Sequence, residues 1–348
     1  MFRFLLNLIY RFLSFIYTDL SFLVEPGEQN SSITNLIFFV KDKFGRNIPF
    51  MKIVQTFWSR PIVDRMSTSY NGGWLEKKYN YMSLSLSCLL LKRLYGQVEL
   101  VTDDEGKHIL IDVLRLPYST IKVELNKLSG YNNNLTCAAK FYTYSIQKEP
   151  FIHVDGDFFL YEKPDRGIER YPCVVANEID FYPPAFDRFL DYMESLQMAA
   201  EEVARGYNPG FFGGNAPTYI AGFAKGCLDL FDKNLDFINK NIDFATGDSV
   251  VAQEGVHPFA YVNMIIESYF FHSFAKGHGI KVGRAFEHPD AGSSGNGAML
   301  GIGPRVKYRQ PMYDKRRPSV CLQLEYQLRK RYPEQYHTIL SAIKEYKF

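Results

Sequence analysis

The sequence lacks several features that would assign a protein class at once. It has no Gly-rich phosphate loop ending in Lys-Ser or Lys-Thr, no serine nucleophile elbow and no internal repeat. A formal net charge of +2 over 348 residues argues against a protein devoted to binding nucleic acid. The five cysteines are scattered without zinc-site spacing, which predicts buried free thiols of a reducing compartment: Cys88, Cys137, Cys173, Cys227 and Cys321.

The composition that remains is that of an ordinary globular protein. Hydrophobic residues make up 46% and charged residues 22% of the chain, which is long enough for one large α/β domain or two smaller ones. Apolar residues recur with strand and helix periods in alternation, which predicts a mostly parallel central sheet flanked by helices. The expected strands are Lys52–Phe57, Val98–Val101, Thr120–Glu124, Phe151–Val154, Tyr171–Asn177 and Lys281–Phe286. The expected helices are Leu75–Tyr95, Gly106–Leu116, Ala138–Gln147, Pro183–Arg205, Ile220–Asn239, Pro258–Lys276, Ser319–Tyr332 and Glu334–Lys347, the last two forming a C-terminal cap.

An acidic turn follows the buried strand Phe151–Val154. Asp155 and Asp157 lie on either side of Gly156, and apolar residues resume immediately afterwards. Two carboxylates this close repel each other unless positive charge lies between them. Hard oxygen ligands of this kind suit Mg²⁺ or Mn²⁺, so the turn predicts a metal site. The alternative is a plain surface turn, since Asp and Gly both favour turns.

The segment from Phe151 to Leu160 resembles the Asp-X-Asp strand of glycosyltransferases with the GT-A fold. Its layout is similar to that of glycogenin and of the bacterial lipopolysaccharide glucosyl- and galactosyltransferases. The resemblance covers roughly residues 52 to 284. It implies a GT-A-like (Rossmann-like) fold, Mn²⁺ or Mg²⁺ held by Asp155 and Asp157, a nucleotide-sugar donor with UDP by analogy, and a glycan or lipid-linked acceptor of polysaccharide biosynthesis.

Three further residues, two after strands and one on a helix, are donor-binding candidates. Trp58 follows the first strand, where the resemblance places the nucleotide, although a packing role fits equally. Asp103 follows the second strand and either touches the nucleoside or caps a helix. Lys140 lies on the helix before the acidic turn and either neutralises phosphate, pairs with Asp155, or is a solvated lysine.

A glycine-rich segment around residues 207–215 resembles the Asn-X-Gly element that lines the sugar sites of these transferases. On that basis Asn208, Gly210, Gly213 and Gly214 are donor- or acceptor-binding candidates, because glycine permits close backbone approach and Asn offers both a donor and an acceptor. The alternative is a glycine-rich turn that enters a helix.

The catalytic base has three candidates among the carboxylates: Glu178, Asp180 and Glu267. Only an inverting transferase needs such a base, and the sequence leaves the stereochemistry open. His288 follows a late strand, where the resemblance implies a third metal ligand. No lysine follows it at the expected spacing, and Lys307 is a more distant substitute.

The chain divides by composition into residues 1–50, a GT-A-like domain at 51–290 and a Gly-rich loop with C-terminal helices at 291–348. Residues 1–23 are apolar but interrupted by charges. They predict either an amphipathic helix on a membrane surface or a helix docked on the protein. The start Met51-Lys52-Ile53 also leaves open that residues 1–50 are an extension. We expect a cytoplasmic protein, either free or peripheral at the inner face of the membrane.

The function predicted is metal-dependent glycosyl transfer from a nucleotide-diphosphate sugar, the work of a hexosyltransferase-like enzyme. Two other functions stay open. One is a metal-dependent phosphohydrolase or nucleotidyltransferase, which needs further converging acidic residues. The other is a non-catalytic protein that binds carbohydrate or a membrane surface and retains the fold.

Overall fold

The structure is a computed structural model of the 348-residue chain. It describes residues 51–63, 71–133, 135–180, 205–233, 258–286, 307–311 and 314–346. The chain divides into two units, residues 1–50 and 51–348, and only the second contains described residues. The expected membrane-surface segment 1–23 and residues 183–204 of the expected helix 183–205 lie outside the described residues, and Arg205 begins a strand instead.

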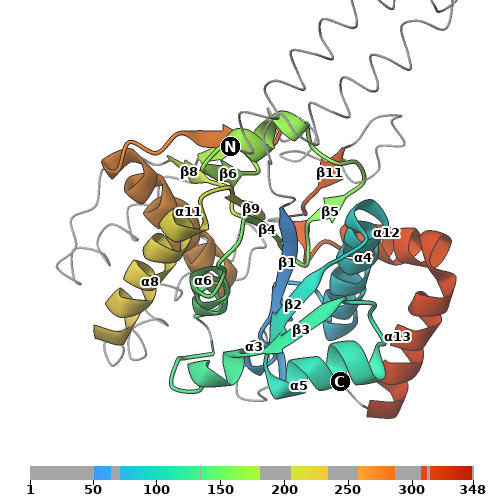
Figure 1. Cartoon of the computed structure of the whole chain (residues 1–348). Helices are drawn as coiled ribbons and strands as arrows, with labels where there is room; N and C mark the ends of the chain where they lie inside the picture. Colours follow the sequence, from blue (N-terminus) through green and yellow to red (C-terminus); the bar gives the residue numbers. More distant parts are fainter. Residues whose placement is uncertain are drawn as a thin grey trace, which may run out of the picture. The chain divides into compact units, whose positions relative to one another are not determined.

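A seven-stranded sheet forms the centre of the second unit (Figure 1). Its order is β10-β6-β9-β4-β1-β2-β3, and every neighbouring pair is parallel except those made by β9. The bounds are β1 Lys52–Phe57, β2 Glu99–Thr102, β3 Thr120–Val123, β4 Phe151–Val154, β6 Cys173–Val175, β9 Phe211–Gly214 and β10 Val282–Arg284. This confirms the mostly parallel α/β architecture predicted from the alternation of elements.

The order of the strands determines where a ligand crevice forms. From β1 the chain adds β2 and β3 on one side, and β4 then returns to the other side of β1. The chain leaves β1 towards one side of the sheet and leaves β4 towards the other, so a crevice opens beyond the carboxyl ends of β1 and β4. The acidic turn follows β4 directly and therefore lies at this crevice.

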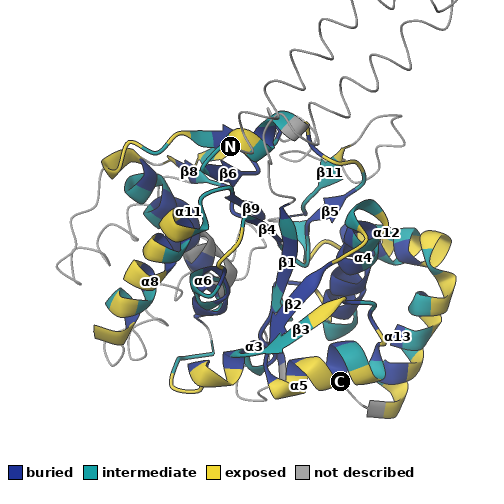
Figure 2. Cartoon of the chain, in the orientation of Figure 1, coloured by how far each residue is buried: buried dark blue, intermediate teal, exposed yellow. Residues whose placement is uncertain are grey.

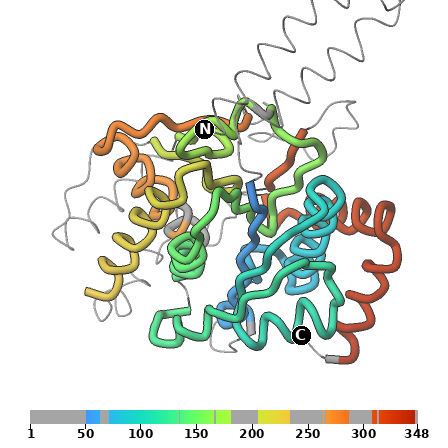
Figure 3. Tube along the Cα trace, viewed as in Figure 1, coloured from blue at the N-terminus to red at the C-terminus, as the bar shows by residue number. Residues whose placement is uncertain are grey.

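Helices cover both faces of the sheet. α4 (Lys77–Tyr95) packs with α12 (Pro318–Arg331) and α13 (Pro333–Tyr346), which follow each other at the C-terminal end of the chain (Figures 1 and 3). α6 (Cys137–Ser145), α8 (Pro217–Lys233) and α11 (Pro258–Gly277) pack together as a second group. The two C-terminal helices thus confirm the predicted helical cap.

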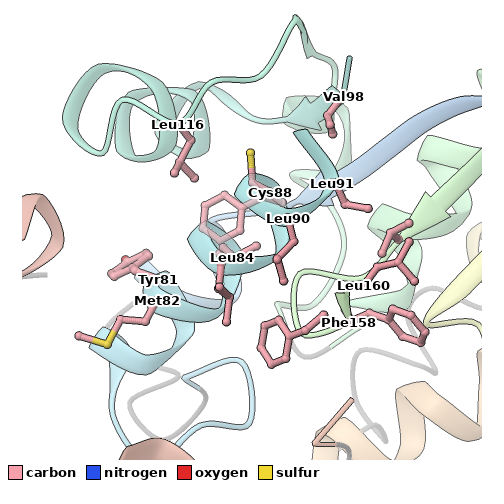
Figure 4. Close-up of a cluster of buried hydrophobic side chains, with 14 of the residues drawn as sticks. Tyr81, Met82, Leu84, Cys88, Leu90, Leu91, Val98, Leu116, Phe158 and Leu160 are labelled. Atoms are coloured by element: carbon pink, nitrogen blue, oxygen red, sulfur yellow. The ribbon is translucent and has the colours of Figure 1, made fainter. Parts of the chain in front are cut away.

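The alternation of side chains along each strand produces two separate cores. In β1, Ile53 and Phe57 join the core beneath α4, whereas Val54 joins the core beneath α6. Figure 4 shows part of the first core, where leucines of α4 meet Phe158 and Leu160 from beyond the acidic turn. The inner strands β2, β4, β6 and β9 are buried along their whole length, whereas the edge strand β3 and the outer helices show exposed residues (Figure 2).

Short elements complete the unit. The expected helix 106–116 is a short α5 (Asp104–Lys107) followed by a π-helical stretch, His108–Val113. The remaining pieces are α3 Arg60–Val63, the 3-10 turns Leu125–Leu128 and Arg166–Arg170, the pair β5 Phe159–Leu160 with β11 Tyr308–Arg309, and the pair β7 Glu178–Asp180 with β8 Arg205–Tyr207. Within the described ranges, no helix has the length and apolar character needed to cross a bilayer.

Candidate active site

A cavity of about 240 Å³ opens at the carboxyl ends of β1 and β4. Trp58 lines it from the end of β1, and Asp155 and Asp157 line it from the end of β4. The other lining residues come from α3, α4, α6 and α11 and from the loops that contain Gly72, Asn208, Gln310 and Lys315. The cavity therefore occupies the switch-point crevice that the strand order dictates.

The acidic turn is held by serines of α4 and by the segment before β9. Ser83 Oγ donates to the Gly156 carbonyl at 2.7 Å, and Ser87 Oγ donates to the Phe158 carbonyl at 2.9 Å. The Asp155 amide donates to the Gly210 carbonyl at 2.9 Å. These bonds satisfy main-chain groups of the turn, so the two carboxylates extend from a fixed backbone.

Lys140 on α6 lies between two carboxylates from different elements. Its Nζ is 2.9 Å from Asp155 Oδ1, and it also pairs closely with Glu267 Oε2 from α11. Burial lowers the pKa of Lys140, but Asp155 and Glu267 outweigh burial and raise it well above its usual value. Lys140 is therefore a permanent cation at the base of the cavity.

Asp157 has its own cation, which comes from the C-terminal part of the chain. Lys315 Nζ lies 2.5 Å from Asp157 Oδ2. Burial acts to raise the pKa of Asp157, but the charge of Lys315 outweighs it and the net shift is downward. The pKa of Asp155 shifts upward, because burial and the neighbouring charge of Asp157 outweigh Lys140. The two carboxylates are thus electrostatically distinct although they share one turn.

Glu267 is the third carboxyl group of the cavity. It is 7% exposed, and burial raises its pKa to about 7 although Lys140 opposes the shift. A carboxyl group with a pKa near neutrality can take up and release a proton under physiological conditions. Of the three carboxylates predicted as catalytic bases, Glu267 is the one that lines the cavity.

His153 is a cavity residue that the sequence analysis treated only as part of a strand. It is 1% exposed, its Nε2 lies 2.9 Å from Thr56 Oγ1, and its Nδ1 lies 3.6 Å from Asp155 Oδ1. Burial, reinforced by the charge of Lys140, lowers its pKa well below the usual value. His153 is therefore a neutral polar group beside Asp155.

Asn208 and Gly210 lie where the chain enters β9. Asn208 lines the cavity, accepts from the Gly210 amide at 2.9 Å, and donates to Gln310 Oε1 at 3.0 Å. A Cβ on Gly210 would lie 2.4 Å from Gln310 Nε2, so only glycine allows Gln310 to approach. The Asn-X-Gly element thus joins the cavity to the C-terminal segment.

Two buried donors from residues that line the cavity have no hydrogen-bond partner among the described residues. They are Trp58 Nε1 and Asn80 Nδ2. Trp58 is 5% exposed and Asn80 is 8% exposed. Buried polar groups are usually hydrogen-bonded, so these two enclosed donors are exceptions beside the cavity.

Asp103 lies at the end of β2 but does not line the cavity. Its carboxylate accepts from Ser59 Oγ at 2.7 Å, from the Ser59 amide at 3.1 Å and from the Gly106 amide at 2.8 Å. It is the N-cap of α5. These contacts correspond to the helix-cap alternative, in which the carboxylate accepts its hydrogen bonds from neighbouring groups of the protein.

Gly213 and Gly214 lie inside the sheet rather than along the cavity wall. A Cβ on Gly213 would lie 2.0 Å from the Phe151 carbonyl oxygen, and one on Gly214 would lie 2.2 Å from the Pro172 carbonyl oxygen. Both positions therefore need glycine so that β9 can pack between β4 and β6.

The remaining candidates lie elsewhere. Glu178 and Asp180 belong to β7, where Glu178 pairs with Arg284 at 3.6 Å and Asp180 with Arg205 at 3.1 Å. Both are exposed and neither lines the cavity. His288 lies outside the described residues.

The donor set was tested for its fit to the divalent ion predicted from the sequence. Within the described ranges no three His, Cys, Asp or Glu side chains converge on one point. Asp155 and Asp157 supply hard oxygen atoms, but each is already paired with a lysine. Two carboxylates fit Mg²⁺ or Mn²⁺ where phosphate oxygens and water complete the coordination. The set therefore fits an ion that arrives with phosphate.

Comparisons with known proteins gave one family and several distant structures. The model of a family of unknown function (DUF6734) matches residues 51–342. No curated protein matches the chain.

Solved structures match at low similarity. The galactosyltransferase LgtC in complex with donor and acceptor sugar analogs is 12% identical, with a TM-score of 0.31 and coverage of 56% of this chain and 66% of that one. Mouse xyloside xylosyltransferase 1 is 12% identical, with a TM-score of 0.30 and coverage of 62% and 80%. The glycosyltransferase GlyE of Streptococcus pneumoniae TIGR4 is 11% identical, with a TM-score of 0.28 and coverage of 53% and 39%. The match thus spans less than two thirds of LgtC and GlyE.

Proposed function

The chain belongs to the DUF6734 family, and from its cavity we propose that it transfers a sugar from a nucleotide-diphosphate sugar to a glycan or lipid-linked acceptor. One observation carries the proposal. The acidic turn, Lys140, Glu267 and Asn208 come from separate elements and line one cavity at the carboxyl ends of β1 and β4. The resemblance of the turn to the Asp-X-Asp strand of GT-A enzymes supplies the reaction class.

Asp155 and Asp157 are the residues that would hold Mn²⁺ or Mg²⁺ together with the donor. Such an ion supplies Lewis-acid stabilisation of the departing diphosphate, worth several kcal/mol of barrier. The fixed backbone of the turn keeps both carboxylates in place for this task, because Ser83 and Ser87 hold its carbonyl groups.

Lys140 contributes charge that needs no ion. It lies beside Asp155, away from bulk water, and its charge is maintained by two carboxylates. In this position it attracts negative charge that develops on the leaving group.

In an inverting transfer, we propose that Glu267 is the general base that removes the proton from the acceptor hydroxyl group. The carboxylate takes the proton from the acceptor hydroxyl, the hydroxyl oxygen bonds to the anomeric carbon, and the bond from that carbon to the diphosphate oxygen breaks. Its raised pKa of about 7 suits a base that works near neutral pH. In a retaining transfer Glu267 instead anchors a hydroxyl group, and the anomeric configuration of the product distinguishes the two.

The test is donor hydrolysis by the full chain. UDP-, GDP- and ADP-sugars are incubated with the protein and Mn²⁺ or Mg²⁺, and free sugar and nucleoside diphosphate are measured by chromatography. We expect slow release from one donor, abolished in Asp157→Asn and kept in Asp180→Asn, whose carboxylate lies outside the cavity. Hydrolysis that Asp157→Asn leaves intact would contradict the proposal.

Parallel incubations with nucleotides that carry no sugar, and with free glycans, separate the rival functions. Phosphate or nucleotide monophosphate released from nucleotides that carry no sugar would indicate a phosphohydrolase. Binding of free glycans without turnover of any donor would indicate a carbohydrate-binding protein that retains the fold.

A further inference from the structure

Lys315 connects the acidic turn to two other parts of the molecule. Besides its ion pair with Asp157, its Nζ donates to the Gly72 carbonyl at 3.2 Å and lies 6.0 Å from the centre of the Trp74 ring. Its own carbonyl accepts from Cys321 Sγ on α12 at 3.2 Å. A lysine that left Asp157 would therefore change the surroundings of Trp74.

The charges that line the cavity nearly cancel before any ligand binds. Among the described residues that line it, the charged groups are the cations Lys140 and Lys315 and the carboxyl groups of Asp155, Asp157 and Glu267. A diphosphate binding alone would meet at least as many carboxylates as lysines. A divalent ion binding alone would meet carboxylates that are already neutralised. Either ligand by itself would leave charge unpaired in a partly buried site, which is costly.

We propose that Lys315 makes the binding of a divalent ion and the binding of a nucleoside diphosphate depend on each other. When both arrive together, Asp157 exchanges Lys315 for the ion and Lys315 transfers to a phosphate oxygen. Every charge then keeps an opposite partner, which neither ligand achieves alone. The long flexible stem of lysine permits the move, and an ammonium group binds phosphate as a point charge.

This inference rests on the proposed function, because it takes the ligand to be a nucleoside diphosphate. It adds a role for the C-terminal segment around Lys315. Because of Lys315, the site binds the ion and the diphosphate together more tightly than it binds the ion alone or the diphosphate alone. It also explains why the acidic turn is fully paired within the chain itself.

The test measures the two ligands separately and together on the full chain. Free Mn²⁺ is counted by its electron paramagnetic resonance signal, with and without UDP, GDP or ADP, and with correction for Mn²⁺–nucleotide complexes in solution. We expect the nucleotide to tighten Mn²⁺ binding by a factor of about 5 to 150, and Mn²⁺ to tighten nucleotide binding by the same factor. Trp74 emission, measured in a Trp58→Phe background because Trp58 also lines the cavity, should change when both are present, because Lys315 then moves away from Trp74.

Three variants assign the effect to Lys315. In Lys315→Met, Mn²⁺ alone should bind several-fold more tightly than in the natural chain, and the coupling factor should fall towards one. Lys315→Arg keeps the charge and should keep most of the coupling. Arg316→Met removes an equal charge from the adjacent, exposed position and should behave as the natural chain does.

The outcomes separate this inference from the proposed function. If Mn²⁺ alone binds the natural chain as tightly as Lys315→Met, Lys315 does not compete and the inference is wrong, while the proposed function stands. The same holds if a nucleotide binds equally well in the presence of a chelator. If no nucleoside diphosphate binds under any condition, both fall together.

Discussion

Two strand ends of this molecule carry carboxylates at the same edge of the sheet, yet they are held differently. At the end of β2, Asp103 accepts hydrogen bonds from the Ser59 and Gly106 amides and from the Ser59 hydroxyl. At the end of β4, Asp155 and Asp157 are paired with the ammonium groups of Lys140 and Lys315. Main-chain amides cannot leave without unfolding α5, whereas lysine side chains can. The first arrangement stabilises the fold, and the second can exchange partners for a ligand.

The largest effect should come from removing a carboxylate at the β4 end. Asp157→Asn should lower donor turnover by about 100-fold or more, because the loss of several kcal/mol of barrier reduction corresponds to that factor. The cost in stability should be about 2 kcal/mol, because the charge of Lys315 loses its partner, although Asn keeps a hydrogen-bond acceptor and the lysine side chain is 18% exposed. Initial rates and urea unfolding measure the two effects. If Asp157→Asn lowered activity only because it lowered the stability of the fold, the β4 end would serve the fold in the same way as the β2 end does.

The β2 end should respond in the opposite way. Asp103→Ala leaves the buried amides of Ser59 and Gly106 without an acceptor and removes the cap of α5, so stability should fall by about 2 kcal/mol. Nucleotide affinity of the folded protein should not change, because Asp103 does not line the cavity. Denaturant unfolding and calorimetric titration provide the comparison. If the folded Asp103→Ala protein bound nucleotide more weakly than the natural chain does, Asp103 would contact the nucleoside and the helix-cap assignment would be incomplete.

A smaller effect should separate two serines of α4. Ser83 holds the acidic turn through the Gly156 carbonyl, whereas the buried Ser85 hydroxyl has no partner among the described residues. Ser83→Ala should weaken nucleotide binding about fivefold, equivalent to about 1 kcal/mol, through looser placement of Asp157. Ser85→Ala should leave binding unchanged, and Ser83→Thr, which restores the hydroxyl, should recover it. Equal effects in the two alanine variants would mean that the hydroxyl does not position the turn.

The last effect concerns pH and leaves the contacts of both strand ends in place. Burial raises the pKa of Glu267 from 4.5 to about 7, so the folded state binds its proton more tightly than the unfolded state. The associated stability is present below pH 4.5 and is lost as pH rises through about 7. Glu267→Gln cannot ionise, so its stability relative to the natural chain should increase over that range and then level off. Thermal unfolding between pH 4.5 and about 8 measures the difference, and a constant difference would contradict the assignment.

Local patterns in the sequence located most of the elements around the site. The strand Phe151–Val154 and the turn after it were predicted because a short apolar run and its neighbouring acids are adjacent in sequence. The helix expected at 106–116 was only partly right, because the short α5 gives way to a π-helical stretch at His108. Apolar recurrence indicates a helix but does not distinguish i+4 from i+5 hydrogen bonding.

The site residues that were missed come from positions with ordinary local patterns. Lys315 begins a basic run that is typical of a solvated surface, and Gln310 has no distinguishing neighbour. His153 lies within a short, fully buried strand, where nothing in the local sequence separates it from residues that only pack in the core. The glycines of β9 matched a binding motif in sequence, but their close contacts with β4 and β6 account for them.

The sequence by itself determined the alternation of strands and helices, the buried β4 and the acidic turn at its end, because these follow from periodicity and from residues adjacent in the chain. Only the tertiary structure decided which partners those acids have. In the folded chain, main-chain amides donate hydrogen bonds to Asp103. Lys140 pairs with Asp155 and Glu267, and Lys315, which is distant in sequence, pairs with Asp157. The physical reason is that an ion pair depends on distance in space, and the packing of α12 against α4 sets that distance while leaving no periodic trace in the sequence.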